Sequence, residues 1–225
     1  MKKLALIVAA FACFSCAGAD PAQKYPNMIA NLDPVQLGSI EASFDLMFST
    51  KLKSSAINVV FIPRENAVAL EFRHDLIRYR QFWNQNARLY FIEALNRYNE
   101  DFTAKNLVYK YSKSRAAYGK TKGGLEWENF KFSSTYKSSP IFELGYRFRG
   151  QSPYFAVMQR SAKDEKGNTG GKAPMESSAF AMYFTKAQGE ALAQLFRQDY
   201  LLELIGDNLT DEPPPVSNKP AGDVY

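Results

Sequence analysis

Residues 57–72 read INVVFIPRENAVALEF, and this stretch decides the fold. Apolar side chains recur at every second position before and after a short polar segment, at Ile57, Val59 and Phe61 and again at Val68, Leu70 and Phe72. A period of two is typical of strands that bury one face. The intervening Pro63-Arg64-Glu65-Asn66 has the residues of a tight turn. The stretch therefore predicts two antiparallel strands joined by a turn.

On the N-terminal side, the alternation begins at about Ser39 and continues through Phe44, Leu46, Phe48 and Leu52, which predicts one more strand. The preceding residues 20–38 are polar and contain three prolines, so we interpret them as a lead-in.

On the C-terminal side the period changes to that of a helix. From Asp75 to about Ala104 apolar residues recur at helical spacing: Tyr79, Trp83, Ala87, Tyr90, Phe91, Ala94, Leu95, Tyr98 and Phe102. This predicts one long amphipathic helix that buries its apolar stripe against a sheet.

After Asn106 the strand period returns. We expect five strands, at about 107–111, 125–136, 142–148, 154–161 and 175–184, with a turn at Gly119–Gly124. Thr185 is a suitable N-cap for a second amphipathic helix that ends at Gly206.

This order is three strands, a long helix, five strands and a helix. It predicts an α+β fold with a mainly antiparallel sheet of about eight strands packed with two amphipathic helices. We expect one globular domain over residues 39–206. Residues 207–225 are acidic and proline-rich, and we interpret them as a disordered tail.

The first 19 residues have the layout of a secretory signal peptide: Lys2 and Lys3, an apolar run from Leu4 to Phe14, then small residues. Two processing routes are open. Cleavage before Asp20 releases a soluble protein, whereas Cys16 as a lipid-bearing first residue anchors it to a membrane. We expect an exported, periplasmic or extracellular protein, with membrane contact only if Cys16 is lipidated.

Composition narrows the possible chemistry. Cysteines occur only at positions 13 and 16, and His74 is the single histidine, so we expect no catalytic residue set, no metal site and no cofactor. The chain carries 28 Lys and Arg against 23 Asp and Glu, a net charge of +5. Its basic residues are dispersed, which argues against nucleic acid and leaves an anionic ligand, a glycan or an envelope protein as the partner.

Arginine beside aromatic rings can bind anionic or sugar-like ligands. Within the expected long helix we therefore select Arg78, Trp83 and Arg88 as candidate ligand-binding residues. Arg147 and Arg149, which flank Phe148 on a strand, are a similar set. Core packing of the aromatic residues, with arginines at the margin, explains the same pattern.

The alternative function is a carboxylate-dependent hydrolase acting on envelope glycans. Glu126 and Glu128 share one face of an expected strand on either side of Trp127. Glycosidases use two carboxyl groups, one as acid and the other as base or nucleophile. The opposite interpretation, a solvent-facing pair with Trp127 in the core, remains open.

The segments Ile57–Pro63, Val68–Phe72 and Tyr79–Trp83 resemble uncharacterised exported proteins of spirochaetes. The resemblance covers about residues 56–107 and implies an envelope location without an assigned activity. We therefore expect an exported cell-envelope protein that is a non-enzymatic binding or interaction module.

Overall fold

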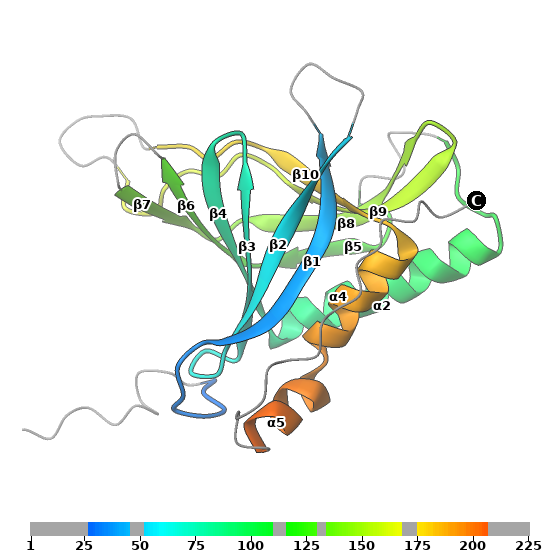
Figure 1. The fold of residues 1–225 in the computed structure, drawn as a ribbon. Helices are drawn as coiled ribbons and strands as arrows, with labels where there is room; N and C mark the ends of the chain where they lie inside the picture. The colour runs from blue at the N-terminus through cyan, green and yellow to red at the C-terminus, as the bar shows by residue number, and fades with distance from the viewer. Residues whose placement is uncertain (1–26, 46–51, 110–115, 130–133, 168–174, 207–225) are drawn as a thin grey trace, which may run out of the picture.

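A computed structural model describes residues 27–45, 52–109, 116–129, 134–167 and 175–206 (Figure 1). The expected signal peptide, with Cys16, and the expected C-terminal tail lie outside the described residues.

The described part of the chain contains ten strands and three helices. The strands are β1 (Val35–Asp45), β2 (Leu52–Ile62), β3 (Ala67–His74), β4 (Ile77–Asn84), β5 (Gly119–Lys122), β6 (Gly124–Asn129), β7 (Ser134–Ser138), β8 (Ile141–Arg149), β9 (Ser152–Gln159) and β10 (Phe180–Phe184). The helices are α2 (Gln85–Thr103), α4 (Lys186–Phe196) and α5 (Gln198–Gly206).

The ten described strands form one curled sheet in the order β5-β8-β9-β10-β1-β2-β3-β4-β6-β7 (Figure 1). All pairs are antiparallel. The expected α+β class with a mainly antiparallel sheet is confirmed, but the strand count of about eight is wrong. β5 and β7 are the two edges of the sheet, and the central pairs β1–β2 and β2–β3 include the stretch that decided the prediction.

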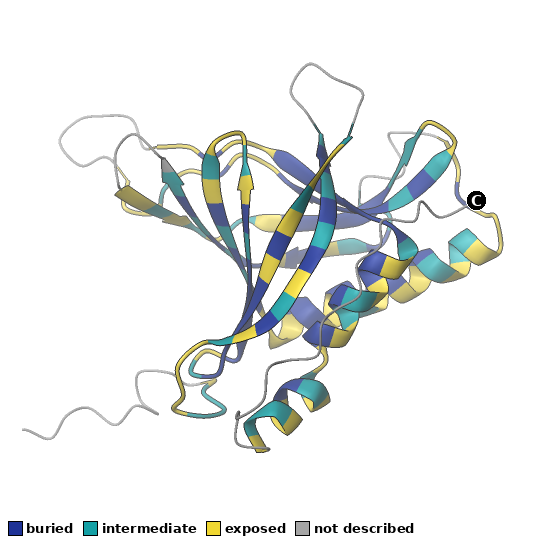
Figure 2. Ribbon diagram, in the orientation of Figure 1, coloured by how far each residue is buried: buried dark blue, intermediate teal, exposed yellow. Residues whose placement is uncertain are grey.

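The two faces of the sheet differ, and we call them inner and outer. The inner face carries Ile57, Val59, Phe61 and their equivalents on the other strands, and it packs against α2 and α4. The outer face carries the alternate residues. Figure 2 shows the resulting alternation of buried and less buried positions along β1 and β2.

The curl of the sheet brings distant strands together across its inner face. The ring centroids of Trp83 on β4 and Phe142 on β8 are 4.7 Å apart. Tyr79 on β4 and Phe180 on β10 are 4.9 Å apart. At this separation aromatic pairs stabilise each other beyond simple burial. The inner face is therefore a continuous aromatic core, closed at one end by α2 and α4.

The expected helix from Asp75 to Ala104 is wrong in its first third. Residues 77–84 form β4, and the helix α2 begins only at Gln85. Asn84 ends the strand and caps the helix, since its side chain accepts a hydrogen bond of 2.9 Å from the backbone N–H of Ala87. Helix α2 is therefore 19 residues long.

Several expected strand limits also change. The first strand starts at Val35 rather than near Ser39, and residues 107–109 are not a strand. The expected turn at Gly119–Gly124 contains the strand β5. The segment 125–136 divides between β6 and β7, and the last strand is only Phe180–Phe184.

The N-cap at Thr185 is confirmed. Its hydroxyl accepts from the backbone N–H of Gln188, whose side chain accepts from the backbone N–H of Thr185, so the two form a capping box. The expected single helix up to Gly206 is wrong, because Arg197 is extended, with φ −65° and ψ 131°, and separates α4 from α5.

Candidate functional site

The outer face of β3, β4, β6 and β7 carries a row of alternating charges. Cross-strand register places Glu71, Arg80, Glu126 and Lys137 side by side. Arg80 Nε lies 2.8 Å from Glu71 Oε1, and Lys137 Nζ lies 2.5 Å from Glu126 Oε1. Opposite charges on neighbouring strands stabilise a sheet modestly. This row is balanced in charge, and its four side chains form ion pairs with one another at the surface.

The neighbouring row is not balanced. Register places Arg73 directly opposite Arg78, followed by Glu128 and Thr135. Arg78 Nη1 reaches Glu128 Oε2 at 3.4 Å, whereas Arg73 has no carboxylate partner among the described residues. Like charges directly opposite each other destabilise a strand pair. Two arginines in this arrangement therefore favour a bound anion.

An open depression of about 500 Å³ lies at these two arginines. It is lined by Ser55, Ala56, Asn58, Glu71, Phe72, Arg73 and Arg78. These residues come from β2, β3 and β4, so rigid sheet strands hold them in place. Amide and guanidinium groups at such a concavity can donate hydrogen bonds to ligand oxygens.

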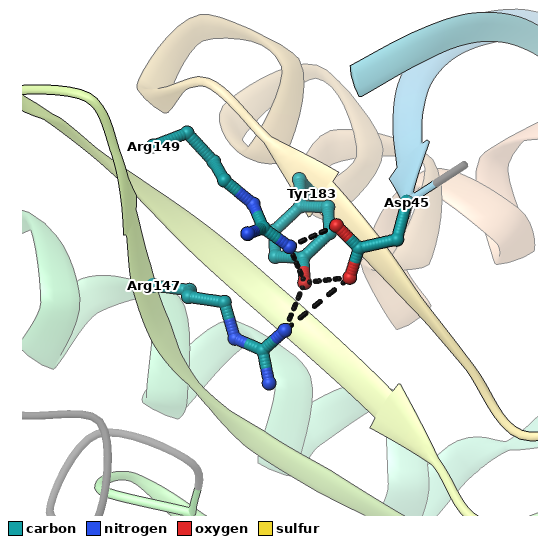
Figure 3. A network of polar contacts seen from close by, with 4 residues as sticks. All are labelled: Asp45, Arg147, Arg149 and Tyr183. Carbon is teal, nitrogen blue, oxygen red and sulfur yellow. Dashed lines mark hydrogen bonds and ion pairs between the residues drawn. The ribbon is translucent and has the colours of Figure 1, made fainter. Parts of the chain in front are cut away.

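A second polar cluster on the outer face joins three strands (Figure 3). It consists of Asp45 at the end of β1, Arg147 and Arg149 on β8, and Tyr183 on β10. The hydroxyl of Tyr183 donates to Asp45 Oδ2 at 2.6 Å and accepts from Arg147 Nη1 at 2.7 Å and Arg149 Nη2 at 2.8 Å. Arg147 Nη1 lies 3.3 Å from Asp45 Oδ2, and Arg149 Nη2 also binds Asp45 Oδ1. We call these four residues the Asp45 cluster.

Burial affects the Tyr183 phenol of this cluster. Tyr183 is fully buried, and its burial, followed by its hydrogen bond to Asp45, raises the pKa of its phenol. The phenol therefore remains a neutral donor. The cluster thus combines two guanidinium groups, one carboxylate and one neutral phenol.

The structure separates the three predicted ligand-binding residues. Arg78 lies on the outer face and lines the depression. Trp83 lies on the same strand but on the inner face, fully buried against Phe91 and Phe142. The premise that Arg78 and Trp83 share a helix is wrong, because both belong to β4.

Arg88 lies on a helix, α2, as expected, but its side chain is buried and does not line the depression. Its Nη2 donates to Asn66 Oδ1 at 2.9 Å and to Gln198 Oε1 at 2.6 Å, while Nε and Nη1 have no hydrogen-bond partner among the described residues. Burial lowers the pKa of Arg88 to about 10. This arginine ties the first turn of α2 to the β2–β3 turn and to the start of α5.

The two carboxylates named for the alternative hydrolase function both form ion pairs with basic side chains. Glu126 pairs with Lys137, and Glu128 pairs with Arg78. They share the outer face as expected, whereas Trp127 is buried on the inner face, where it stacks on Tyr136. A tryptophan behind the sheet has no access to a sugar held by these carboxylates.

The single histidine, His74, lies at the junction of two strands. The residue ends β3, and a tight turn at Asp75 and Leu76 leads directly into β4, so no helix follows it. Both turn residues have positive φ, 48° and 65°. The His74 ring stacks on Phe44 with a centroid distance of 5.3 Å, and its Nε2 lies 3.2 Å from Asp75 Oδ2. Burial lowers the pKa of His74, against the opposing effect of Asp75 and Asp45.

Sequence reasoning missed two parts of the outer face. It identified Arg78, Arg147 and Arg149, but not Arg73, Asp45 or Tyr183. Arg73 lies opposite Arg78 because a two-residue turn follows His74, and Leu76 in that turn is not a typical turn residue. Asp45 and Tyr183 are 138 positions apart and carry no local signal.

The fold and the outer face thus define an antiparallel α+β protein with two cationic clusters on one face of a curled sheet. A family model described as an uncharacterised Treponema protein matches residues 34–203, and the chain belongs to this family. The expected link to spirochaete proteins is confirmed at that level. No curated protein and no solved structure shows a match to the chain.

Among the described residues, no helix combines the length and apolar character needed to cross a membrane. No group of three or more His, Cys, Asp or Glu side chains is arranged to hold a metal ion in the described ranges.

Proposed function

We propose that the protein is a non-enzymatic binding module of the cell envelope and that the outer face of β2–β4 binds an anionic ligand, with an acidic glycan as the best-fitting class. The observation that carries this proposal is the pair Arg73 and Arg78, side by side at an open depression, with Arg73 lacking a carboxylate partner among the described residues.

Geometry supports a glycan in particular. The depression is wide and open, and Asn58 on β2 supplies a neutral amide group on the same face as the two guanidiniums. Carboxylate groups of an acidic sugar pair with arginine in a bidentate manner, while sugar hydroxyls suit the neutral amide. The layout of residues 1–19 supports delivery to the envelope, where such polymers occur.

The binding experiment uses the full chain and oligogalacturonate as the carboxylated probe, measured by isothermal titration calorimetry. We expect binding that weakens as salt increases, because the contacts are charge-assisted. The double variant R73Q/R78Q removes both contacts, and we expect its affinity to fall at least about ten-fold, which corresponds to about 1.4 kcal/mol.

The matched control is R64Q/R160Q, which makes the same change in net charge at exposed arginines outside the depression. Arg64 pairs with Asp33, and Arg160 pairs with Glu143. The proposal fails if both double variants bind equally well, since the general charge of the surface would then explain the affinity. Equal binding of neutral dextran would also contradict it.

The two processing routes remain part of the proposal. Mass spectrometry of the mature N-terminus distinguishes them: Asp20 as the first residue gives a soluble protein, and a lipidated Cys16 gives a membrane-anchored one.

A further inference from the structure

In the Asp45 cluster, several hydrogen-bond donors converge on a single carboxylate. Three separate groups bind the two oxygens of Asp45: the Tyr183 hydroxyl, Arg147 and Arg149. Both guanidiniums also lie over the Tyr183 ring, with Cζ at 5.8 Å for Arg147 and 4.9 Å for Arg149. These three donors are therefore held in place by the sheet and by each other.

A clamp between strands accounts for part of this arrangement. Asp45 belongs to β1 and the arginines to β8, and β9 and β10 lie between them in the sheet. An ion pair across this distance ties β1 to β8. Arg149 adds a second guanidinium to the same carboxylate.

The guanidinium of Arg149 also remains incompletely satisfied. Its Nε is buried and has no hydrogen-bond partner among the described residues. A buried donor without an acceptor costs free energy. The guanidinium of Arg149 thus has donor capacity beyond what Asp45 uses.

We propose that Arg147, Arg149 and Tyr183 form a phosphate-binding site in which the Asp45 carboxylate is the internal occupant that a phosphate group displaces. A phosphate carries up to two negative charges, which matches two guanidiniums, and it has more acceptor oxygens than a carboxylate. Arginine forks fit phosphate oxygens in a bidentate manner. Tyr183 supplies a neutral donor at the base of the site.

Asp45, whose carboxylate the phosphate would displace, is more exposed to solvent than the two arginines. The side chain of Asp45 is 33% exposed, compared with 16% and 23% for Arg147 and Arg149. Asp45 is the last residue of β1, so its side chain can turn outward without breaking the strand pairing within the sheet. The arginines, in contrast, lie along β8 and are fixed by its pairing with β9.

The test compares phosphate binding by R73Q/R78Q and by the same chain with D45N added. The shared R73Q/R78Q background removes the other arginine pair of the outer face. Titration of inorganic phosphate at constant ionic strength is followed by calorimetry and by the midpoint of thermal unfolding. Removing the competing charge of Asp45 is expected to increase the affinity for phosphate at least ten-fold. Adding R149Q to the D45N chain is expected to abolish this gain.

D33N is the matched control, because it neutralises an exposed aspartate that pairs with Arg64 and lies outside the cluster. A folded D45N chain whose phosphate affinity equals that of D33N would overturn the proposal. If D45N does not fold in phosphate-free buffer, restored folding on addition of phosphate supports the proposal, and failure of phosphate to restore it counts against it. Y183F keeps the ring, and a loss of phosphate affinity in D45N/Y183F assigns the hydroxyl.

A second experiment identifies the kind of molecule that carries the phosphate. Sedimentation with phosphatidylglycerol vesicles, compared with phosphatidylcholine vesicles, tests a lipid headgroup in which the phosphate is a singly charged diester. Vesicle binding that depends on Arg147 and Arg149 assigns the headgroup. Binding of inorganic phosphate without vesicle binding assigns a free phosphate or a soluble phosphate ester.

Discussion

The inner and outer faces of the sheet are built from alternate residues of the same strands, yet they use opposite chemistry. On β4, Tyr79 and Trp83 are fully buried among aromatic rings, whereas Arg78 and Arg80 pair with carboxylates at the surface. The inner face depends on burial of apolar area, which is the larger stabilising contribution. The outer face depends on ion pairs, which contribute little to stability when exposed. We therefore expect substitutions on the inner face to reduce stability and substitutions on the outer face to affect mainly binding.

The largest effect is expected from Trp83→Ala. Trp83 is fully buried between Phe91, Phe142 and Phe196, so its removal leaves a large cavity in the core. Truncations of this kind cost about 3–5 kcal/mol of unfolding free energy. Chemical denaturation followed by circular dichroism measures the loss.

The neighbouring residue is the control for this comparison. Phe82 is on the outer face, partly buried, with Arg80 over its ring at 5.1 Å. Phe82→Ala is expected to cost clearly less than Trp83→Ala. Equal costs would show that the two faces do not differ as described.

The next effect concerns the connection between β5 and β6. A Cβ atom at Gly123 would lie 2.2 Å from Phe142 Cε2 and 2.9 Å from the carbonyl oxygen of Phe82. Gly123→Ala forces the ring or the backbone to move, and overpacking of this kind costs about 1–3 kcal/mol. Gly206→Ala is the control, because nothing lies within 4 Å of its added Cβ. Thermal unfolding of both variants gives the difference.

The smallest effect is expected from the single histidine. Burial holds the pKa of folded His74 below the ordinary value of 6.5, although Asp75 and Asp45 act in the opposite direction and Lys53 in the same one. As pH falls below 6.5, the unfolded chain binds a proton before the folded chain does, so His74 lowers stability from that pH down to its folded pKa. His74→Gln should remove this part of the pH dependence. Urea denaturation of both proteins between pH 7 and pH 5 measures it, and identical slopes would contradict the assignment.

Strand alternation predicted the inner face well at β2 and β3, because Ile57 through Phe72 follow the period without interruption. It failed at β4 for a physical reason. The inward position 81 is a glutamine, whose buried Nε2 donates to Gln159 Oε1 at 3.0 Å. With a polar residue at that position, the remaining Tyr79 and Trp83 are four residues apart and match a helical stripe continued by α2.

The candidate sites were predictable only where local sequence decides them. Arg78 was identified as a candidate, and its partner Arg73 follows from the short turn at Asp75 and Leu76. Turn residues at positive φ are usually glycine, asparagine or aspartate, so Leu76 gave no turn signal. The Asp45 cluster depends on the strand order β8-β9-β10-β1, which alternation alone does not specify.

The two edges of the sheet have a consequence for how copies of the chain meet. β5 is a four-residue strand with exposed Lys120 and Lys122, and the backbone of Lys137 on β7 already accepts a hydrogen bond of 2.8 Å from Glu165 N–H. Short, lysine-bearing and covered edges disfavour pairing with another chain's strand. At high protein concentration, such edges protect the described ten-stranded sheet against aggregation by strand addition.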